Sequence, residues 1–214
     1  EGYTGAISGN AANGYIITNT HEVQSTSVTV NKVWEDAQNQ DGIRPASIEV
    51  QLKANGKEVE SATLSENNNW TYTFTDLAVY ANGQEIVYTV DEAVVPDGYT
   101  KSVDGYTITN THTPELTKVE GKKVWADNNN QDGKRPSEIT VILLADNVEA
   151  DRKTVSGYGN EWTYTFNNLP KYKNGNAIVY KVDEVEAAGY SKNIEGFVIT
   201  NTYEVEKVNV EGQK

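Results

Sequence analysis

The chain has 214 residues, a net charge of −13 and neither Cys nor Met. The acidic charge argues against binding to nucleic acid or to anionic membranes, because both need basic patches. The absence of Cys excludes disulfides, thiolate zinc sites and cysteine nucleophiles. No apolar run approaches the roughly 20 residues that span a bilayer, so we expect no membrane insertion. Because the chain lacks an initiator Met, we expect it to be a fragment of a longer protein.

Short segments rich in Val, Ile, Thr and Tyr predict strands from one end of the chain to the other. The first of them ends in "YIITNT" at 15–20. Seven more are predicted over the following residues, near 26–35, 47–54, 57–64, 70–75, 85–94, 99–103 and 105–112. "ANGK" at 54–57 has the Asn-Gly pair of a tight hairpin turn. This spacing of strands is typical of an all-β sandwich.

The rest of the chain repeats these elements with a step of 91 residues at the first and last strands and 92 at the motif before the last strands. "NKVWEDAQNQDGIRP" at 31–45 matches "KKVWADNNNQDGKRP" at 122–136, and "IVYTVDE" at 86–92 matches "IVYKVDE" at 178–184. The motif "ITNT" closes each copy, so that Asn19, Asn110 and Asn201 are evenly spaced. We therefore predict two complete domains, 24–114 and 115–205. They are flanked by the C-terminal strand region of a preceding repeat, 1–23, and the first strand of a following one, 206–214.

Three strands of each predicted domain interrupt an apolar face with one polar residue. In the first domain the polar residues are an amine, Lys32, a carboxyl, Glu92, and a carboxamide, Asn110. Their apolar neighbours by alternation are Val28, Val30, Trp34, Ile86, Tyr88, Val90, Tyr106 and Ile108. The second domain repeats the set as Lys123, Glu184 and Asn201, among Val119, Trp125, Ile178, Tyr180, Val182, Phe197 and Ile199. The closing motif likewise predicts Asn19 on one face with Tyr15 and Ile17.

Two interpretations of these polar residues stand side by side. They could lie at strand ends and reach solvent, or form a buried ion pair that the Asn satisfies. Alternatively, burial lowers the pKa of the Lys and raises that of the Glu, which yields a neutral amine and a protonated carboxyl. Attack of that amine on the Asn carboxamide, with proton transfer through the Glu, would release ammonia and leave an isopeptide bond. The neighbouring Asp91 and Asp183 fall on the solvent side, which favours Glu92 and Glu184 as the inward carboxyls.

Together "KVW…NQDGxRP", "WTYTF", "YxVDE" and "ITNT" resemble the Cna protein B-type domains of Gram-positive surface adhesins and pilins. The resemblance covers both predicted domains and both partial ones. It implies tandem Ig-like or prealbumin-like Greek-key sandwiches of about seven strands, each with a Lys–Asn isopeptide bond promoted by a buried Glu. Matched positions are Lys32, Asn110 and Glu92, then Lys123, Asn201 and Glu184. Asn19 and Lys214, which lack partners in their incomplete repeats, should stay unlinked.

The resemblance also implies the biological setting. It places the chain in a structural stalk of a virulence-associated adhesin, extracellular and anchored to the cell wall, which projects a separate ligand-binding region. The expected partners are neighbouring repeats, and a host extracellular-matrix protein contacted through other regions of the parent protein. The alternative function is an adhesive module that itself binds a matrix protein or glycan. Apart from the single self-cross-linking event per domain, no enzymatic activity is expected.

Weaker signals point to structure rather than to a cofactor or metal. "NNNQDG" at 128–133 faintly resembles a calcium loop, but Ile139 stands where an EF-hand needs a bidentate Glu. His21 and His112 have no nearby His or Cys in the sequence. The four Trp residues are interpreted as core anchors rather than as a sugar-stacking platform. We therefore expect no cofactor and no metal site.

Overall fold

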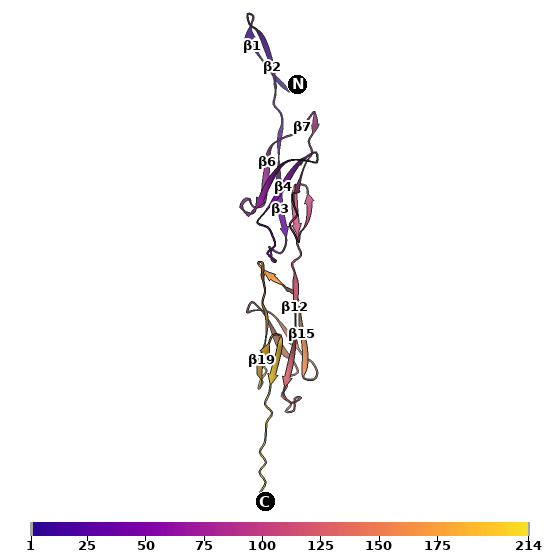
Figure 1. Ribbon diagram of the computed structural model, residues 1–214, viewed down its shortest axis with the longest axis vertical. Helices are drawn as coiled ribbons and strands as arrows, with labels where there is room; N and C mark the ends of the chain where they lie inside the picture. Colours follow the sequence, from indigo (N-terminus) through magenta and orange to yellow (C-terminus); the bar gives the residue numbers. More distant parts are fainter. Residues whose placement is uncertain (1, 214) are drawn as a thin grey trace. The chain divides into compact units, whose positions relative to one another are not determined.

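The computed structural model describes residues 2–213, which form strands joined by turns and one short 3₁₀ helix, η1 (Glu66–Asn68) (Figure 1). Contacts between Cα atoms divide the chain into two units, with the main boundary between His112 and Thr113. Each unit contains one β-sandwich. The predicted all-β class and tandem sandwich architecture are confirmed.

The first sandwich consists of a four-stranded and a three-stranded sheet. In spatial order the larger sheet contains β10 (Thr100–Asp104), β11 (Thr107–Thr111), β3 (Ser25–Glu35) and β6 (Thr71–Ala78). The smaller sheet contains β5 (Lys57–Ser65), β4 (Ser47–Ala54) and β9 (Tyr88–Glu92). A two-residue ladder joins β7 (Tyr80–Ala81) to β8 (Gln84–Glu85). Seven strands thus form the two sheets, as the spacing of the sequence predicts.

The second sandwich has the same topology. Its larger sheet contains β19 (Ser191–Glu195), β20 (Val198–Thr202), β12 (Leu116–Ala126) and β15 (Glu161–Pro170). Its smaller sheet contains β14 (Val148–Val155), β13 (Ile139–Ala145) and β18 (Tyr180–Glu184). The short ladder is formed by β16 (Tyr172–Lys173) and β17 (Asn176–Ala177).

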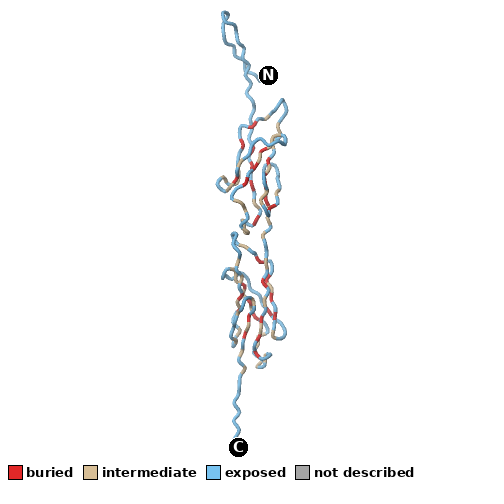
Figure 2. Tube along the Cα trace, in the orientation of Figure 1, coloured by how far each residue is buried: buried red, intermediate tan, exposed pale blue. Residues whose placement is uncertain are grey.

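In each sandwich the first strand lies next to the last and runs parallel to it. β3 pairs with β11, and β12 pairs with β20. Alternate residues of these strands face the smaller sheet, and the buried residues gather between the two sheets (red in Figure 2). Two hydrophobic clusters result, one per domain, around Val30, Leu52 and Phe74 in the first and Val141, Leu143 and Phe166 in the second.

The N-terminal segment forms a separate hairpin of β1 (Tyr3–Asn10) and β2 (Gly14–His21). Its pairing resembles that of β10 and β11, since Thr4 lies opposite Thr20 as Thr100 lies opposite Thr111. Every residue of both strands is exposed (pale blue in Figure 2). That this hairpin ends a preceding repeat stays a prediction. The apolar face that alternation predicts around Tyr15 and Ile17 is not buried in the described structure. No smaller sheet covers β2 within residues 2–213.

The predicted strand limits need two further corrections. The strand expected at 85–94 is interrupted, with β8 ending at Glu85 and β9 beginning at Tyr88. Tyr106 does not face the core, because β11 begins at Thr107 and the Tyr106 side chain is 40% exposed in the preceding turn. Among the described residues, no helix has the length and apolar character needed to cross a membrane.

One core position differs between the two domains. Gly121 of β12 lies opposite Tyr164 of β15, whose buried hydroxyl donates a hydrogen bond to the Phe197 carbonyl oxygen at 2.7 Å. A Cβ on Gly121 would lie 2.3 Å from the Tyr164 ring, so only Gly leaves room for the ring. In the first domain Val30 fills this position, and the matching Tyr72 is 43% exposed. Because of Gly121, the Tyr164 ring is buried in the second core, where Val30 contributes the buried side chain in the first.

Candidate intramolecular cross-linking site

The parallel pairing of the first and last strands brings a lysine and an asparagine to one face of the larger sheet. In the first domain Lys32 lies opposite Ile108, and Trp34 lies opposite Asn110. Residues two apart on a strand share a face, so Lys32 and Asn110 both project toward the smaller sheet. The Lys32 Nζ atom lies 3.4 Å from the carbonyl oxygen of Ile108. The amine of β3 therefore reaches the neighbouring strand β11, close to Asn110.

The carboxyl group comes from the opposite sheet. Glu92, the last residue of β9, is 3% exposed, and its Oε1 accepts a hydrogen bond from Asn110 Nδ2 at 3.1 Å. This contact joins the two sheets across the core. The three residues that alternation places on inward faces are therefore buried in one region, although 18 or more residues separate each from the next along the chain.

The second domain repeats this geometry. Asn201 Nδ2 donates to Glu184 Oε1 at 3.0 Å, and the Lys123 Nζ atom lies 3.3 Å from Glu184 Oε2. Lys123 and its neighbour Trp125 lie opposite Ile199 and Asn201 in the parallel ladder. Lys123 is fully buried at 0% exposure.

Several polar atoms of these two sites lack a hydrogen-bond partner within the described residues. They are Glu92 Oε2, Asn110 Oδ1 and Asn201 Oδ1. An unsatisfied polar atom in a protein interior costs about 1–3 kcal/mol, and more when it is charged. Packing alone does not offset this cost, so the arrangement favours a chemical role for these groups.

Burial shifts the protonation equilibria of the site toward the neutral forms. Desolvation lowers the pKa of Lys32 to about 8, and it lowers that of Lys123 to about 8 as well. Desolvation raises the pKa of Glu92 and of Glu184 above the ordinary value for a glutamate. The buried amine can therefore act as a nucleophile while the carboxyl carries a proton.

A tryptophan covers the amine in each domain. The Nζ atom of Lys32 lies 4.3 Å from the centre of the Trp34 ring, and that of Lys123 lies at the same distance from Trp125. Trp34 packs edge-to-face on Trp70 at 5.2 Å between ring centres. The tryptophans are thus part of the core and shield the amine from water.

A second buried cluster, which the sequence reasoning missed, lies beside each tryptophan. In the first domain Asp36 is 2% exposed and accepts hydrogen bonds from Arg44 Nε at 2.9 Å and from the Tyr99 hydroxyl at 2.8 Å. The second domain has the same cluster of Asp127, Arg135 and Tyr190. All three positions repeat at the 91-residue step. That repetition is the signal in the sequence that could have identified them.

Replacing Asp127 with Ala should lower the free energy of unfolding of the second domain by about 1.5–3 kcal/mol, because Arg135 loses its charged partner and keeps only the oxygens of Gly159 and Asn160 as acceptors. The hydrogen bond from Arg135 holds the pKa of Asp127 at about 2, against 3.8 for an ordinary aspartate. A lowered pKa means that this stabilisation is complete above pH 4 and is lost as pH falls toward 2. Denaturant unfolding across that range is the measurement. The exposed Asp151→Ala is the control, and an equal effect of both changes would contradict the prediction.

The loop at 128–133 uses its polar groups internally. Asn130 donates its backbone N–H to Asp127 and accepts the backbone N–H of Arg135 on its side chain. Residues 128–130 all have a positive φ, which Asn tolerates better than most residues. Within residues 2–213, no group of three or more His, Cys, Asp or Glu side chains is arranged to hold a metal ion.

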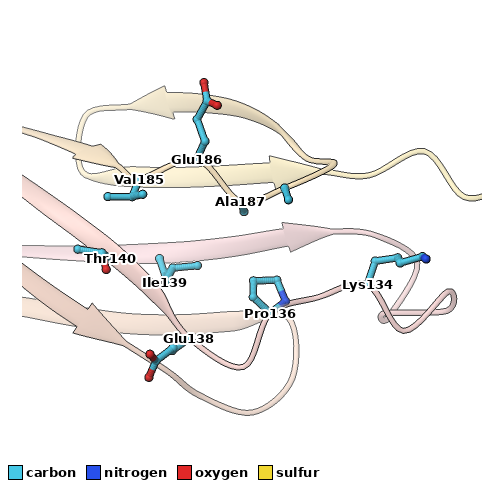
Figure 3. A pocket seen from close by; sticks show the side chains of 9 residues that line it. Lys134, Pro136, Glu138, Ile139, Thr140, Val185, Glu186 and Ala187 are labelled. Carbon is cyan, nitrogen blue, oxygen red and sulfur yellow. The ribbon is translucent and has the colours of Figure 1, made fainter.

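A shallow pocket in the second domain lies apart from these clusters. Pro136, Ile139, Thr140 and Ala187 contribute to its lining, together with loop residues on either side of them. Figure 3 shows the carboxylates of Glu138 and Glu186 pointing in opposite directions rather than toward a common point. The pocket therefore has no converging polar groups that would suit a specific ligand.

The two incomplete repeats cannot be compared in the same way. Asn19 is exposed on β2, opposite Gly5. Lys214 lies outside the described residues. The expectation that both stay unlinked remains a prediction.

Comparison with known proteins identifies the family. The family model for the "Cna protein B-type domain" matches residues 28–111 and 119–202. The "Collagen adhesin" of Staphylococcus aureus is 45% identical over 197 residues, which cover 89% of this chain and 17% of that relative. A crystal structure of two B repeat units of the S. aureus collagen-binding protein superposes with a TM-score of 0.79 at 42% identity, covering 95% of this chain and 54% of that one. The chain spans less than a fifth of the length of the curated relative, and it belongs to the Cna protein B-type domain family, of which it carries two copies.

Proposed function

We propose that each domain forms an intramolecular isopeptide bond, Lys32 to Asn110 in the first and Lys123 to Asn201 in the second. Glu92 and Glu184 promote the two reactions. The observation that carries this proposal is that an amine, a carboxyl and a carboxamide are buried together between the two sheets of each domain. The carboxamide oxygen of the Asn has no hydrogen-bond partner among the described residues. The same arrangement occurs in both domains, which favours a selected chemical role over an accident of packing.

The reaction requires only groups that the site contains. The neutral Lys Nζ attacks the Asn Cγ, while the Glu carboxyl lies in hydrogen-bond contact with the Nδ2 atom that will leave. The Glu then carries a proton from the amine to the leaving nitrogen, the Cγ–Nδ2 bond breaks, and ammonia departs. A new Cγ–Nζ bond remains. Lys and Asn are consumed, so the event occurs once per domain and involves no turnover.

The role we propose for the cross-linked chain is a spacer in the stalk of a bacterial surface adhesin. The tandem repeats support it, as does the similarity to a relative named collagen adhesin. Neighbouring repeats of the same chain would be the immediate partners. A ligand-binding region elsewhere in the parent protein would contact the host matrix, and the stalk would project it from the cell wall. An isopeptide bond suits this setting because, unlike a disulfide, it cannot be reduced.

Intact mass spectrometry of the folded chain tests the chemistry. The measured mass should be lower than that of the plain sequence by two molecules of ammonia. Glu92→Gln and Glu184→Gln should each restore one of them, because Gln cannot carry the proton. Glu49→Gln, on the exposed face of β4, is the matched control and should restore neither. A wild-type mass equal to that of the plain sequence would refute the bonds.

The alternative function is an adhesive module that itself binds a matrix protein, and the name of the collagen adhesin relative is what favours it. Surface plasmon resonance of this chain on immobilised collagen tests it. The spacer role predicts no saturable binding, whereas saturable binding would support the adhesive function.

A further inference from the structure

A second lysine lies next to each of the asparagines. β10 pairs with β11 so that Lys101 is directly opposite Asn110, and β19 pairs with β20 so that Lys192 is opposite Asn201. Directly opposite residues of an antiparallel pair project from the same face of the sheet. The asparagine therefore has a lysine on each neighbouring strand, Lys32 from β3 and Lys101 from β10.

The second lysine also reaches the promoting glutamate. The Lys101 Nζ atom lies 3.4 Å from the carbonyl oxygen of Glu92, and the Lys192 Nζ atom lies 2.8 Å from that of Glu184. Lys101 thus lies opposite the same asparagine and contacts the main chain of the same glutamate that serve Lys32. Proximity alone does not select between the two amines.

The two lysines differ in their electrostatic surroundings. Lys32 is 6% exposed and donates to the carbonyl oxygens of Val33 and Ile108, and Lys123 lies 3.3 Å from the carboxyl of Glu184, the promoting residue itself. Lys101 instead forms an ion pair with Asp91 Oδ1 at 2.5 Å. Lys192 forms the matching ion pair with Asp183. An amine held by an aspartate carboxylate is not free to approach the carboxamide.

We propose that Asp91 and Asp183 determine the specificity of the cross-link, each by holding the amine of the nearby lysine in an ion pair. Lys32 and Lys123 are then the only competent nucleophiles. This inference rests on the proposed isopeptide chemistry and names the residues that direct it. It also gives a role to the Asp of the "YxVDE" motif, whose carboxylate lies next to the reacting Glu but points away from it.

The charges within the site are consistent with this role. Hydrogen bonds from Lys101 and Lys53 hold the pKa of Asp91 at about 2, so it is ionised at neutral pH. Desolvation is the main cause of the lowered pKa of Lys32, and the nearby charge of Lys101 lowers it by less than that of Arg44 does.

Replacing Lys32 tests whether Lys101 can attack Asn110 in its place. In Lys32→Met the second domain should still lose one ammonia, while Asn110 stays intact. In Lys32→Met/Asp91→Asn, incubated at alkaline pH, Lys101 is released. Its Nζ should attack Asn110 Cγ, with Glu92 passing the proton to the leaving nitrogen. A second ammonia is then lost, and peptide mapping should show a Lys101–Asn110 cross-link.

Two control variants isolate the effect of the ion pair. Lys53→Met, added to Lys32→Met, removes the other cation that Asp91 binds and should leave Asn110 unlinked. Lys32→Met/Asp91→Asn/Lys101→Arg keeps the positive charge but lacks a primary amine, so it should lose ammonia only from the second domain. Intrinsic fluorescence from Trp34 and Trp70 reports whether the first domain remains folded in each variant.

The outcomes separate this inference from the proposed function. An uncross-linked wild-type chain refutes the isopeptide chemistry itself. A wild-type chain linked at Lys32 and Lys123 supports that chemistry, and the variants then decide the role of Asp91. A Lys101 cross-link that forms with Asp91 intact overturns the inference. So does its absence in the folded Lys32→Met/Asp91→Asn variant.

Discussion

Under tension applied through its two ends, the first domain should extend in Glu92→Gln but not in the wild-type chain. The proposed bond joins positions 32 and 110, so force entering β3 would leave through β11 without loading the 78-residue loop between them. Without the bond, unfolding releases this loop. At 3.3–3.6 Å per residue its contour length is roughly 260–280 Å, before the folded end-to-end distance is subtracted.

Single-molecule force spectroscopy of the full chain, held by tags at both termini, measures this extension. Wild-type traces should lack it in both domains, and Glu92→Gln should show one event per molecule. Glu184→Gln is the matched variant and should place a similar event in the second domain, because 78 residues also separate Lys123 from Asn201. Wild-type domains that unfold with this full extension would contradict the mechanical role.

The second large effect concerns thermal stability. Loss of the cross-link in Lys32→Met should lower the free energy of unfolding of the first domain by about 4–5 kcal/mol, by analogy with disulfides that close loops of this size. For a domain of this length, that corresponds to a fall in Tm of about 16–40 °C. Met keeps much of the aliphatic volume and leaves no buried amine, so the change reports mainly on the bond.

Differential scanning calorimetry, with the linkage of each sample checked by mass, tests this expectation. Lys123→Met is the parallel change in the second domain, and each variant should shift only the transition of its own domain. Glu92→Gln should cost more than Lys32→Met, because it leaves an unlinked amine in a dry site. Unlinked variants with unchanged transitions would show that the bond does not stabilise the fold.

Local patterns were sufficient to predict most of the strands and the polar residues that face inward. Period-2 alternation identifies strand faces, and the 91-residue repeat shows that Lys32, Glu92 and Asn110 are not isolated exceptions. Alternation also separated Glu92, which is 3% exposed, from Asp91, whose side chain is 33% exposed. These inferences succeed because a strand in a sandwich must bury one face, whatever its neighbours are.

Other features depend on which segments meet in space. The cluster of Asp36, Arg44 and Tyr99 unites a strand end, a loop and the start of a hairpin, and no short window of sequence contains all three. Tyr72 and Tyr164 occupy the same place in "WTYTF", yet a Gly on the opposite strand buries only the second. The strand pattern alone cannot show which of the two Tyr side chains is buried, because this depends on the volume left by residues far away in the chain.

The all-β class, the repeat and the three residue types of each proposed cross-link follow from local alternation and self-similarity, so the sequence predicts them. The parallel, adjacent arrangement of the first and last strands, which brings Lys32 beside Asn110, is visible only in the folded domain. The fold also places Lys101 opposite Asn110 and in an ion pair with Asp91. Strand order is set by the packing of two sheets over a shared core, and that information is distributed over the whole domain rather than written in any one motif.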